Sequence, residues 1–215
     1  MHNTVKNLLN IENNIKKLNI SNRPKIVAVS KTFKIDKILP LLEHGHTDFG
    51  ENKVQEALEK WTVIKKNNPR VKLHMIGKLQ TNKVKFAVQI FDFIHSVDSE
   101  KLAKKIAEEQ HKINKRIKVF LQVNIGDESQ KSGINKNEIN KYVSYCKEIG
   151  LDLIGLMCIP PLDTDTEIYF KEMKKLNDEQ GLKELSMGMS SDFITALKYS
   201  ATYVRVGSSI FGQRF

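Results

Sequence analysis

The sequence predicts an α/β protein built as a (β/α)8 barrel with one extra helix at its N-terminus. Eight short apolar segments, each typical of a buried strand, alternate with amphipathic helical segments. The strands lie roughly 20 to 35 residues apart, which is the spacing of βαβ units. No GxGxxG motif follows the first strand, so the usual signature of an open dinucleotide-binding sheet is missing, and the count of eight strands favours a closed barrel.

The predicted strands are runs of apolar, often β-branched residues bounded by glycine, proline or polar residues. In chain order they are 25–31, 47–49, 73–77, a segment within 90–97, 117–124, 151–157, 184–188 and 201–207. The helices between them, with apolar side chains at helical spacing, are 35–43, 54–64, 79–88, 98–107, 137–149, 166–176 and one that begins at Ser191 and Asp192. The extra helix, at 3–18, precedes the first strand.

Length and composition favour one domain that spans residues 1–215. The chain has no linker or low-complexity segment, and no apolar run approaches the roughly 18 residues of a membrane helix. Its N-terminus lacks the apolar core of a secretory signal, and Cys146 and Cys158 form no CxxC motif. We therefore expect a cytoplasmic protein with reduced, buried thiols and no membrane partner.

The chain carries a formal charge of +10, from 35 Lys and Arg against 25 Asp and Glu, which would suit a nucleic-acid partner. Only five of the 35 basic residues are arginine, and the lysines are scattered over every predicted helix instead of forming one patch. A general bias towards lysine and asparagine explains this charge better. No nucleic-acid partner is predicted, and an RNA-binding barrel is a hypothesis that rests on the charge alone.

A lysine stands at the end of the first predicted strand. Alternation along that strand places Val27, Val29 and Lys31 on one side. Barrels of this kind carry their chemistry at the C-terminal ends of the strands, and burial there favours the neutral amine that reacts with an aldehyde. The alternative is an ordinary lysine that faces solvent, which the strand considered alone favours.

The last predicted strand runs into Gly207, Ser208 and Ser209, followed by a short helical turn. Free backbone N–H groups at such a turn can bind an anion, and barrels often bind phosphate at the loops after strands seven and eight. Ser190, just after the seventh strand, can add a hydroxyl. A serine cap for the final helix would explain the same residues equally well.

Arg205 lies between Val204 and Val206, so alternation turns its side chain away from theirs. A buried guanidinium cannot lose its charge and needs an acceptor, either a structural carboxylate or a ligand at the barrel mouth. A lysine for an aldehyde, a glycine-serine turn for a phosphate and an arginine for a ring nitrogen together describe pyridoxal 5′-phosphate (PLP).

Short motifs along nearly the whole chain match one known family. They are VAVSK at 27–31, FGENKVQE at 49–56, HMIGKLQTNK at 74–83, SQKSG at 129–133, GLMCIP at 155–160, LSMGMS at 185–190 and VRVGSSIFG at 204–212. By these motifs the sequence resembles the pyridoxal phosphate homeostasis protein family, single-domain relatives of the barrel of bacterial alanine racemase. It departs from the family at Ser200, usually glycine, and at Leu73 and Lys53, where aromatic residues are common.

The resemblance implies a fold-type III PLP-binding barrel in which Lys31 forms the internal aldimine and Arg205 faces the pyridine nitrogen. It further implies that Asn52 lines the ring and that the phosphate is bound by Ser190, Gly207 and Ser208. Members of the family have no established catalytic role. The resemblance therefore implies a PLP carrier that takes part in vitamin B6 homeostasis, with PLP-dependent apo-enzymes as partners, and we expect it to be a monomer.

A PLP-dependent amino-acid racemase or lyase is the alternative function. An arginine opposite the ring nitrogen opposes its protonation and weakens the ring as an electron sink, and the related racemases add a tyrosine base from a second domain for which 215 residues leave no room. A carrier without turnover is therefore favoured. No metal site is predicted, since no other ligand type lies at suitable spacing around His44 and His46. His74 and His95 are expected to be hydrogen-bonded residues of the core or the rim.

Overall fold

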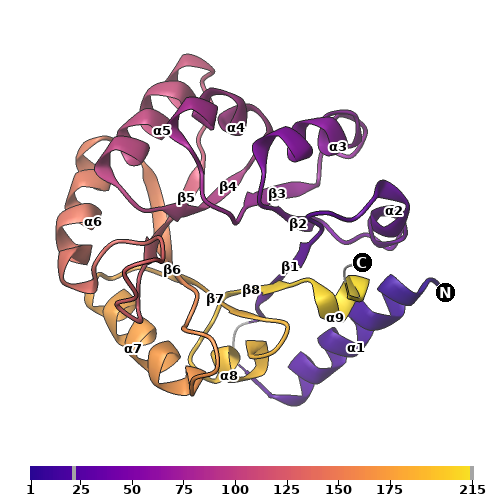
Figure 1. Cartoon of the computed structure of the whole chain (residues 1–215). Coiled ribbons are helices and arrows are strands. Elements are labelled where there is room, and N and C mark those ends of the chain that lie inside the picture. Colours follow the sequence, from indigo (N-terminus) through magenta and orange to yellow (C-terminus); the bar gives the residue numbers. More distant parts are fainter. Residues whose placement is uncertain (21–22, 214–215) are drawn as a thin grey trace.

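The computed structural model, which describes residues 1–20 and 23–213, is a closed barrel of parallel strands that follow one another in chain order (Figure 1). The strands are β1 (Lys25–Val29), β2 (Asp48–Glu51), β3 (Lys72–Met75), β4 (Phe93–Val97), β5 (Lys118–Val123), β6 (Asp152–Cys158), β7 (Glu184–Met189) and β8 (Tyr203–Val206). β8 pairs with β1 and closes the barrel. The predicted (β/α)8 barrel is confirmed.

Helices surround the barrel on its outer side (Figure 1). They are α1 (Asn3–Lys17), α2 (Ile35–Glu43), α3 (Val54–Asn67), α4 (Val84–Ile90), α5 (Glu100–Lys112), α6 (Ile139–Glu148), α7 (Thr166–Glu179), α8 (Phe193–Lys198) and α9 (Ser208–Phe211), with short 3-10 turns η1 (Thr81–Lys83) and η2 (Lys136–Glu138). The extra helix α1 buries its apolar stripe beside α9. Within residues 1–20 and 23–213, no helix has both the length and the apolar character needed to cross a membrane.

The prediction of a single helix over residues 79–88 was wrong at its start. Residues 79 and 80 are not helical, η1 occupies Thr81–Lys83, and the α-helix runs only from Val84 to Ile90. Leu79 is buried in the core just ahead of the helix, which explains why the apolar pattern begins too early.

Ser200 has a φ of +63°, a left-handed conformation that glycine adopts more easily than other residues. This conformation explains why the family that the sequence resembles usually has glycine at this position.

Two apolar clusters lie on the two sides of the sheet. The larger one lies between the strands and the surrounding helices and includes Ile26, Ala28, Val204 and Val206. The smaller one lies inside the barrel and consists of Val27, Phe93, Phe120, Met157 and Tyr203, with Ile154 and Ile159 packed against it. Alternation along each strand therefore separates the two clusters, as the sequence pattern predicts.

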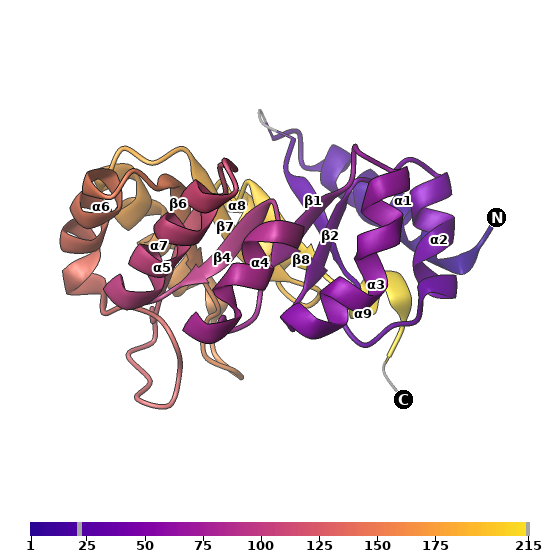
Figure 2. The ribbon, with the colours of Figure 1, turned by 90° about the horizontal axis from the view of Figure 1, so that it is seen from above.

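Aromatic rings close the N-terminal half of the barrel, and we call Phe93, Phe120 and Tyr203 the aromatic floor. The Phe93 and Phe120 rings each lie within 5.7 Å of the Tyr203 ring, centroid to centroid. Lys25 Nζ, from the first residue of β1, lies 5.0 Å from the Tyr203 ring centroid and donates to its hydroxyl at 3.0 Å. Space for a ligand is therefore left at the opposite end, where the strands terminate. Figure 2 shows the loop between β5 and α6 projecting away from the barrel body.

Candidate functional site

A cavity of about 680 Å³ opens at the C-terminal ends of the strands. Its walls come from the ends of β1, β7 and β8 and from residues just after β3 and β6: Val29, Lys31, Ile76, Ile159, Met189, Ser190, Ser191, Arg205, Gly207, Ser208, Ser209 and Gln213. Five of the six residues predicted for the site therefore line one cavity, namely Lys31, Ser190, Arg205, Gly207 and Ser208. A volume of roughly 300 to 1,000 Å³ is usual for a small-molecule site in a protein.

Lys31 extends the inward-facing side of β1. Val27 belongs to the apolar cluster inside the barrel, and Val29 lines the cavity two residues further on. Lys31, again two residues on, is half-buried and lines the cavity as well. The predicted alternation is thus confirmed, and it turns the lysine towards the barrel mouth. The next residue, Thr32, has a φ of +69°, so the backbone bends sharply directly after the lysine.

A group of buried and half-buried residues, which we call the Glu51 cluster, supports the backbone on both sides of Lys31. Its members are Ser30, Glu51, Glu56, Lys60 and Trp61. One carboxylate oxygen, Glu51 Oε1, accepts from Ser30 Oγ at 2.8 Å, from Lys60 Nζ at 2.9 Å and from Trp61 Nε1 at 2.9 Å. Lys60 Nζ also donates to the backbone carbonyl of Ser30 and to Glu56 Oε1, both at 2.9 Å. Glu56 Oε1 in turn accepts from the backbone N–H of Thr32 at 2.6 Å. Both neighbours of Lys31 are therefore fixed by one ion-paired cluster.

The environment of Glu51 is unusual for a carboxylate. Its side chain has no exposed surface, and its second oxygen, Oε2, has no hydrogen-bond partner among residues 1–20 and 23–213. Burial raises the pKa of Glu51 above its ordinary value, and this outweighs the opposing effects of the Lys60 charge and of the hydrogen bonds from Trp61, Lys60 and Ser30. Burying the charge of this carboxylate is therefore costly, and all three of the hydrogen bonds described above that offset this cost go to the same oxygen, Oε1.

Arg205 is the second charged residue in the cavity wall, and 4% of its surface is exposed. Its Nη1 donates to Ser186 Oγ at 2.7 Å and its Nη2 donates to the backbone carbonyl of Cys158 at 2.8 Å. The described residues place no carboxylate in ion-pair contact with it, although the charge of Asp192 opposes the lowering of its pKa that burial causes. Of the two acceptors expected for this arginine, a structural carboxylate or a ligand, the described residues do not supply the carboxylate. Two of the five guanidinium N–H groups have acceptors among these residues.

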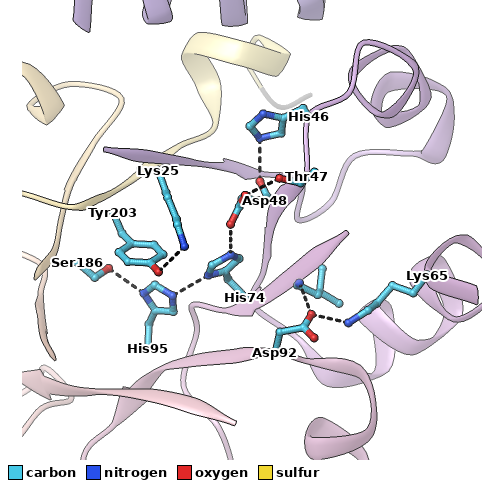
Figure 3. A network of polar contacts seen from close by, with 11 residues as sticks. Lys25, His46, Thr47, Asp48, Lys65, His74, Asp92, His95, Ser186 and Tyr203 are labelled. Atoms are coloured by element: carbon cyan, nitrogen blue, oxygen red, sulfur yellow. Dashed lines mark hydrogen bonds and ion pairs between the residues drawn. The ribbon is translucent and has the colours of Figure 1, made fainter. Parts of the chain in front are cut away.

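Ser186 is the first link of a hydrogen-bonded file that crosses the interior of the barrel (Figure 3). We call this file the crossing chain; its members are Arg205, Ser186, His95, His74 and Asp48. Ser186 Oγ lies 2.8 Å from His95 Nδ1, His95 Nε2 lies 2.9 Å from His74 Nδ1, and His74 Nε2 lies 3.0 Å from Asp48 Oδ1. The file runs from the cavity wall to a carboxylate at the start of β2, where the Asp48 side chain is 16% exposed.

The two histidines of the crossing chain are completely buried and stack on the aromatic floor. The His74 ring lies 4.3 Å from the Phe93 ring and the His95 ring lies 4.4 Å from the Phe120 ring, centroid to centroid. Burial lowers the pKa of His74, against the hydrogen bond and charge of Asp48. Burial also lowers the pKa of His95, and the charges of His74 and Arg205 lower it further. The prediction of hydrogen-bonded core histidines is confirmed, but their connection to Arg205 was not anticipated.

A cradle of backbone N–H groups forms the part of the cavity wall at the ends of β7 and β8. Ser190 Oγ accepts from the backbone N–H of Gly207 at 3.1 Å and of Ser209 at 3.4 Å, and Ser209 Oγ donates to the backbone carbonyl of Ser190 at 3.5 Å. These contacts join the ends of β7 and β8. A Cβ atom at Gly207 would lie 3.3 Å from Val29 Cβ, so glycine lets the turn approach β1 closely. Ser190 thus accepts hydrogen bonds from backbone N–H groups at the start of α9, and Ser190 and Ser209 also line the cavity.

Asn52, the sixth predicted site residue, does not line this cavity. It lines a neighbouring cavity of about 170 Å³ together with Lys78 and Lys83. Its Oδ1 is buried and has no hydrogen-bond partner in the part of the chain that the structure describes. Gly77 packs directly against it, since a Cβ atom at position 77 would lie 2.6 Å from the Asn52 carbonyl oxygen.

Comparison with known proteins gives one consistent result. The chain matches the family model "Alanine racemase, N-terminal domain" over residues 7–214. It is 36% identical to the pyridoxal phosphate homeostasis protein of Pasteurella multocida, covering 97% of this chain and 96% of that protein. It is 38% identical to the protein of the same name from Homo sapiens, covering 89% of this chain and 77% of that protein.

Solved structures agree with the sequence comparison. PipY of Synechococcus elongatus with PLP bound is similar with a TM-score of 0.83 and 31% identity, covering 97% of this chain and all of the other. An alanine racemase of Clostridium difficile, at 21% identity and a TM-score of 0.72, shares the fold over 57% of its own length. The motifs, the barrel and the relatives together show that the chain belongs to the pyridoxal phosphate homeostasis protein family, within the group of alanine racemase N-terminal domains.

Proposed function

We propose that this protein binds pyridoxal 5′-phosphate in the cavity at the barrel mouth and takes part in the homeostasis of this cofactor. The observation that carries the proposal is that a strand-end lysine, a buried arginine and a cradle of serine and glycine N–H groups line one cavity. The names of the relatives and the PLP-bound structure of PipY support it. Each of the three groups suits a different part of the cofactor: an aldehyde, a ring nitrogen and a phosphate.

Lys31 is the proposed covalent anchor. PLP supplies an aldehyde, with which a neutral lysine amine condenses with loss of water. The Glu51 cluster fixes the residues before and after Lys31, so the amine has a defined starting position on the cavity wall. Ser190, Gly207 and Ser208 are the proposed phosphate ligands; the Ser190 hydroxyl that now accepts from the N–H groups of Gly207 and Ser209 would rotate to donate, leaving those N–H groups for phosphate oxygens.

Arg205 is the proposed partner of the ring nitrogen. Its guanidinium lines the cavity, keeps its charge and can only donate hydrogen bonds. A fixed cation at that place opposes protonation of the ring nitrogen, which weakens the ring as an electron sink. This supports a protein that binds the cofactor over one that uses it for rapid turnover. Asn52 would contribute if its Oδ1, which has no partner among residues 1–20 and 23–213, turned towards the ring edge.

Reconstitution tests this proposal. The purified protein, mixed with PLP and desalted, should retain a yellow chromophore, and borohydride should reduce it to a stable adduct that peptide mass spectrometry locates on Lys31. The Lys31→Ala variant should lose both signals. Lys34→Ala, which removes an exposed lysine of the same loop, should keep them. An adduct on another lysine, or full colour retention in Lys31→Ala, would contradict the assignment.

As a carrier, the protein would act as a cytoplasmic monomer that hands PLP to apo-enzymes. The two cysteines support a reducing compartment, since both are buried free thiols, and burial raises the pKa of Cys146 to about 11 and of Cys158 to about 12. Light scattering on the purified protein checks the monomer. Mixing the PLP-loaded protein with an apo-aminotransferase checks the transfer, which should proceed faster than from free PLP at the same concentration.

A further inference from the structure

The crossing chain runs through the barrel between strands on opposite sides. Ser186 and Arg205 lie on the neighbouring strands β7 and β8, whereas His95 and His74 lie on β4 and β3. The link between Ser186 and His95 therefore spans the interior above the aromatic floor (Figure 3). Every member of the chain except Asp48 has 4% or less of its surface exposed: these are Arg205, Ser186, His95 and His74. Buried polar groups of this kind are stable only when each finds a partner.

The chemistry of the two ends fixes the direction of every link. Arg205 can only donate, so Ser186 Oγ accepts from it. At the other end, burial raises the pKa of Asp48, but the hydrogen bonds and charge of its neighbours, first among them His74, outweigh this and lower it. Asp48 is therefore an ionised acceptor, which also receives a hydrogen bond from Thr47 Oγ1 at 2.7 Å. His74 must then carry a proton on Nε2 and donate it to Asp48.

The inner links follow from the neutral state of the histidines. Neutral His74 with its proton on Nε2 has a bare Nδ1, which accepts from His95 Nε2–H. Neutral His95 then has a bare Nδ1, which accepts the hydroxyl proton of Ser186. The reverse direction would need a protonated Asp48, and it would leave the Ser186 hydroxyl proton without an acceptor among the contacts the structure describes. Only one direction satisfies every member.

We propose that Ser186, His95, His74 and Asp48 form a one-directional hydrogen-bond chain, donating from Arg205 towards Asp48, that positions the Arg205 guanidinium in the cavity wall. Asp48 sets the direction, and the two imidazoles, both protonated on Nε2, transmit it across the barrel. Ser186 is the member that touches Arg205, so it is the principal positioning residue. The claim that this arginine faces the ring nitrogen of PLP rests on the proposed function; the direction of the chain does not.

The direction can be measured without any cofactor. Nitrogen-15 NMR of the uniformly labelled apo-protein at pH 7.5 should show His74 and His95 as neutral imidazoles with the proton on Nε2. A proton on Nδ1, or a doubly protonated ring, at either residue would overturn the proposal. Asp48→Asn keeps an acceptor oxygen but removes the charge that fixes the direction, so in this variant the two rings should show a mixture of tautomers.

A serine pair tests the positioning role. Ser186→Ala leaves Arg205 Nη1 and His95 Nδ1 without a partner, and the dissociation constant for PLP should rise by about tenfold. Ser96→Ala is the matched control, since Ser96 is an equally buried serine of β4 whose Oγ has no hydrogen-bond partner among the described residues. Its PLP affinity and histidine signals should stay as in the wild type.

The outcomes separate this proposal from the proposed function. If Lys31→Ala loses PLP while its histidines keep the Nε2 tautomers, the chain exists independently of the cofactor, as expected. If the wild-type protein does not bind PLP but shows the Nε2 tautomers, the proposed function fails and the direction of the chain stands. If Ser186→Ala binds PLP as tightly as Ser96→Ala, the positioning role fails. Should Ser186→Ala not fold, the wild-type tautomers and the Asp48→Asn variant still decide the direction.

Discussion

Two buried polar networks lie behind two walls of the same cavity, the Glu51 cluster behind Lys31 and the crossing chain behind Arg205. In the cluster, three donors converge on one carboxylate oxygen, and the members come from β2, from α3 and from the loop after β1. In the chain, five residues from five strands form single links in a file. The cluster lies on the outer side of the sheet, and the chain fills the interior.

The difference shows two ways to fix a charged residue at a barrel mouth. The convergent cluster neutralises a buried charge locally, so removing one donor leaves an uncompensated carboxylate. In the linear chain, the members between the two charged ends are a hydroxyl and two neutral imidazoles. Removing one member therefore changes which nitrogen carries the proton in the remaining imidazoles. The position of Lys31 thus depends on charge balance, and the position of Arg205 depends on hydrogen-bond direction.

The largest effect is expected from breaking the ion pair of the Glu51 cluster. Lys60→Met removes the cation that contacts the fully buried carboxyl group, with side-chain exposures of 10% and 0% for the pair, and should lower the free energy of unfolding by about 3 to 5 kcal/mol. Urea titration at pH 7 measures this. Lys66→Met, which removes an exposed lysine of the same helix, should change stability by less than about 0.5 kcal/mol. A similarly small cost for Lys60→Met would mean that Glu51 is uncharged at pH 7.

A smaller effect, of opposite sign in the two networks, is expected from acidification. Burial lowers the pKa of His74 and His95 from 6.5, so their contribution to stability is complete above that pH and is lost as the pH falls below it. Burial raises the pKa of Glu51 from 4.5, so its contribution is complete below that pH and is lost as the pH rises through the raised value. One histidine can change the free energy of unfolding by up to about 1.4 kcal/mol per pH unit.

Unfolding titrations between pH 5 and pH 7.5 separate the two contributions. In the wild type, the gain from Glu51 partly offsets the loss from the histidines as the pH falls. Glu51→Gln removes the offsetting carboxyl group, so this variant should lose stability more steeply on the acid side. Parallel pH profiles for the variant and the wild type would show that Glu51 does not titrate in this range.

The smallest effect is expected at the aromatic floor, which touches the chain only by ring contacts. Tyr203→Phe removes the hydroxyl that accepts from Lys25 Nζ but keeps the ring that lies near this ammonium group. Because Lys25 is exposed, water replaces the lost acceptor, and the cost should be below about 1 kcal/mol in the same urea titration. A loss comparable to that of Lys60→Met would indicate that the hydroxyl belongs to the buried network.

Much of the barrel could be predicted because local rules agree with the global fold. Alternation placed Val27 on the same side of its strand as Lys31, and Val204 on the side opposite Arg205. The structure agrees, since Val27 lies in the inner cluster and Val204 in the outer one. The same rule turned Lys31 and Arg205 towards the cavity. The start of the helix at 79–88 could not be predicted, because Leu79 is buried by tertiary packing and not by a helical face.

The polar networks could not be predicted, because their partners are far apart in sequence. His95 and Ser186 are 91 positions apart and meet only when the barrel closes. A signal was nevertheless present, since His74 and His95 are polar residues within apolar strands, where the cost of burial implies a partner. Identifying which partner required the register between strands and the distances across the interior. The placement of Asn52 beside a neighbouring cavity likewise depends on how one loop packs against Gly77.

The aromatic floor also determines how quickly the interior exchanges protons with water. Aromatic rings pack over the N-terminal half of the barrel. The imidazole N–H groups of His74 and His95 can therefore exchange with water mainly when the barrel opens. Their deuterium exchange should therefore be as slow as that of the central strand amides, and it should respond in the same way to urea. The exchange rates of these two side-chain protons would then report how often the barrel opens.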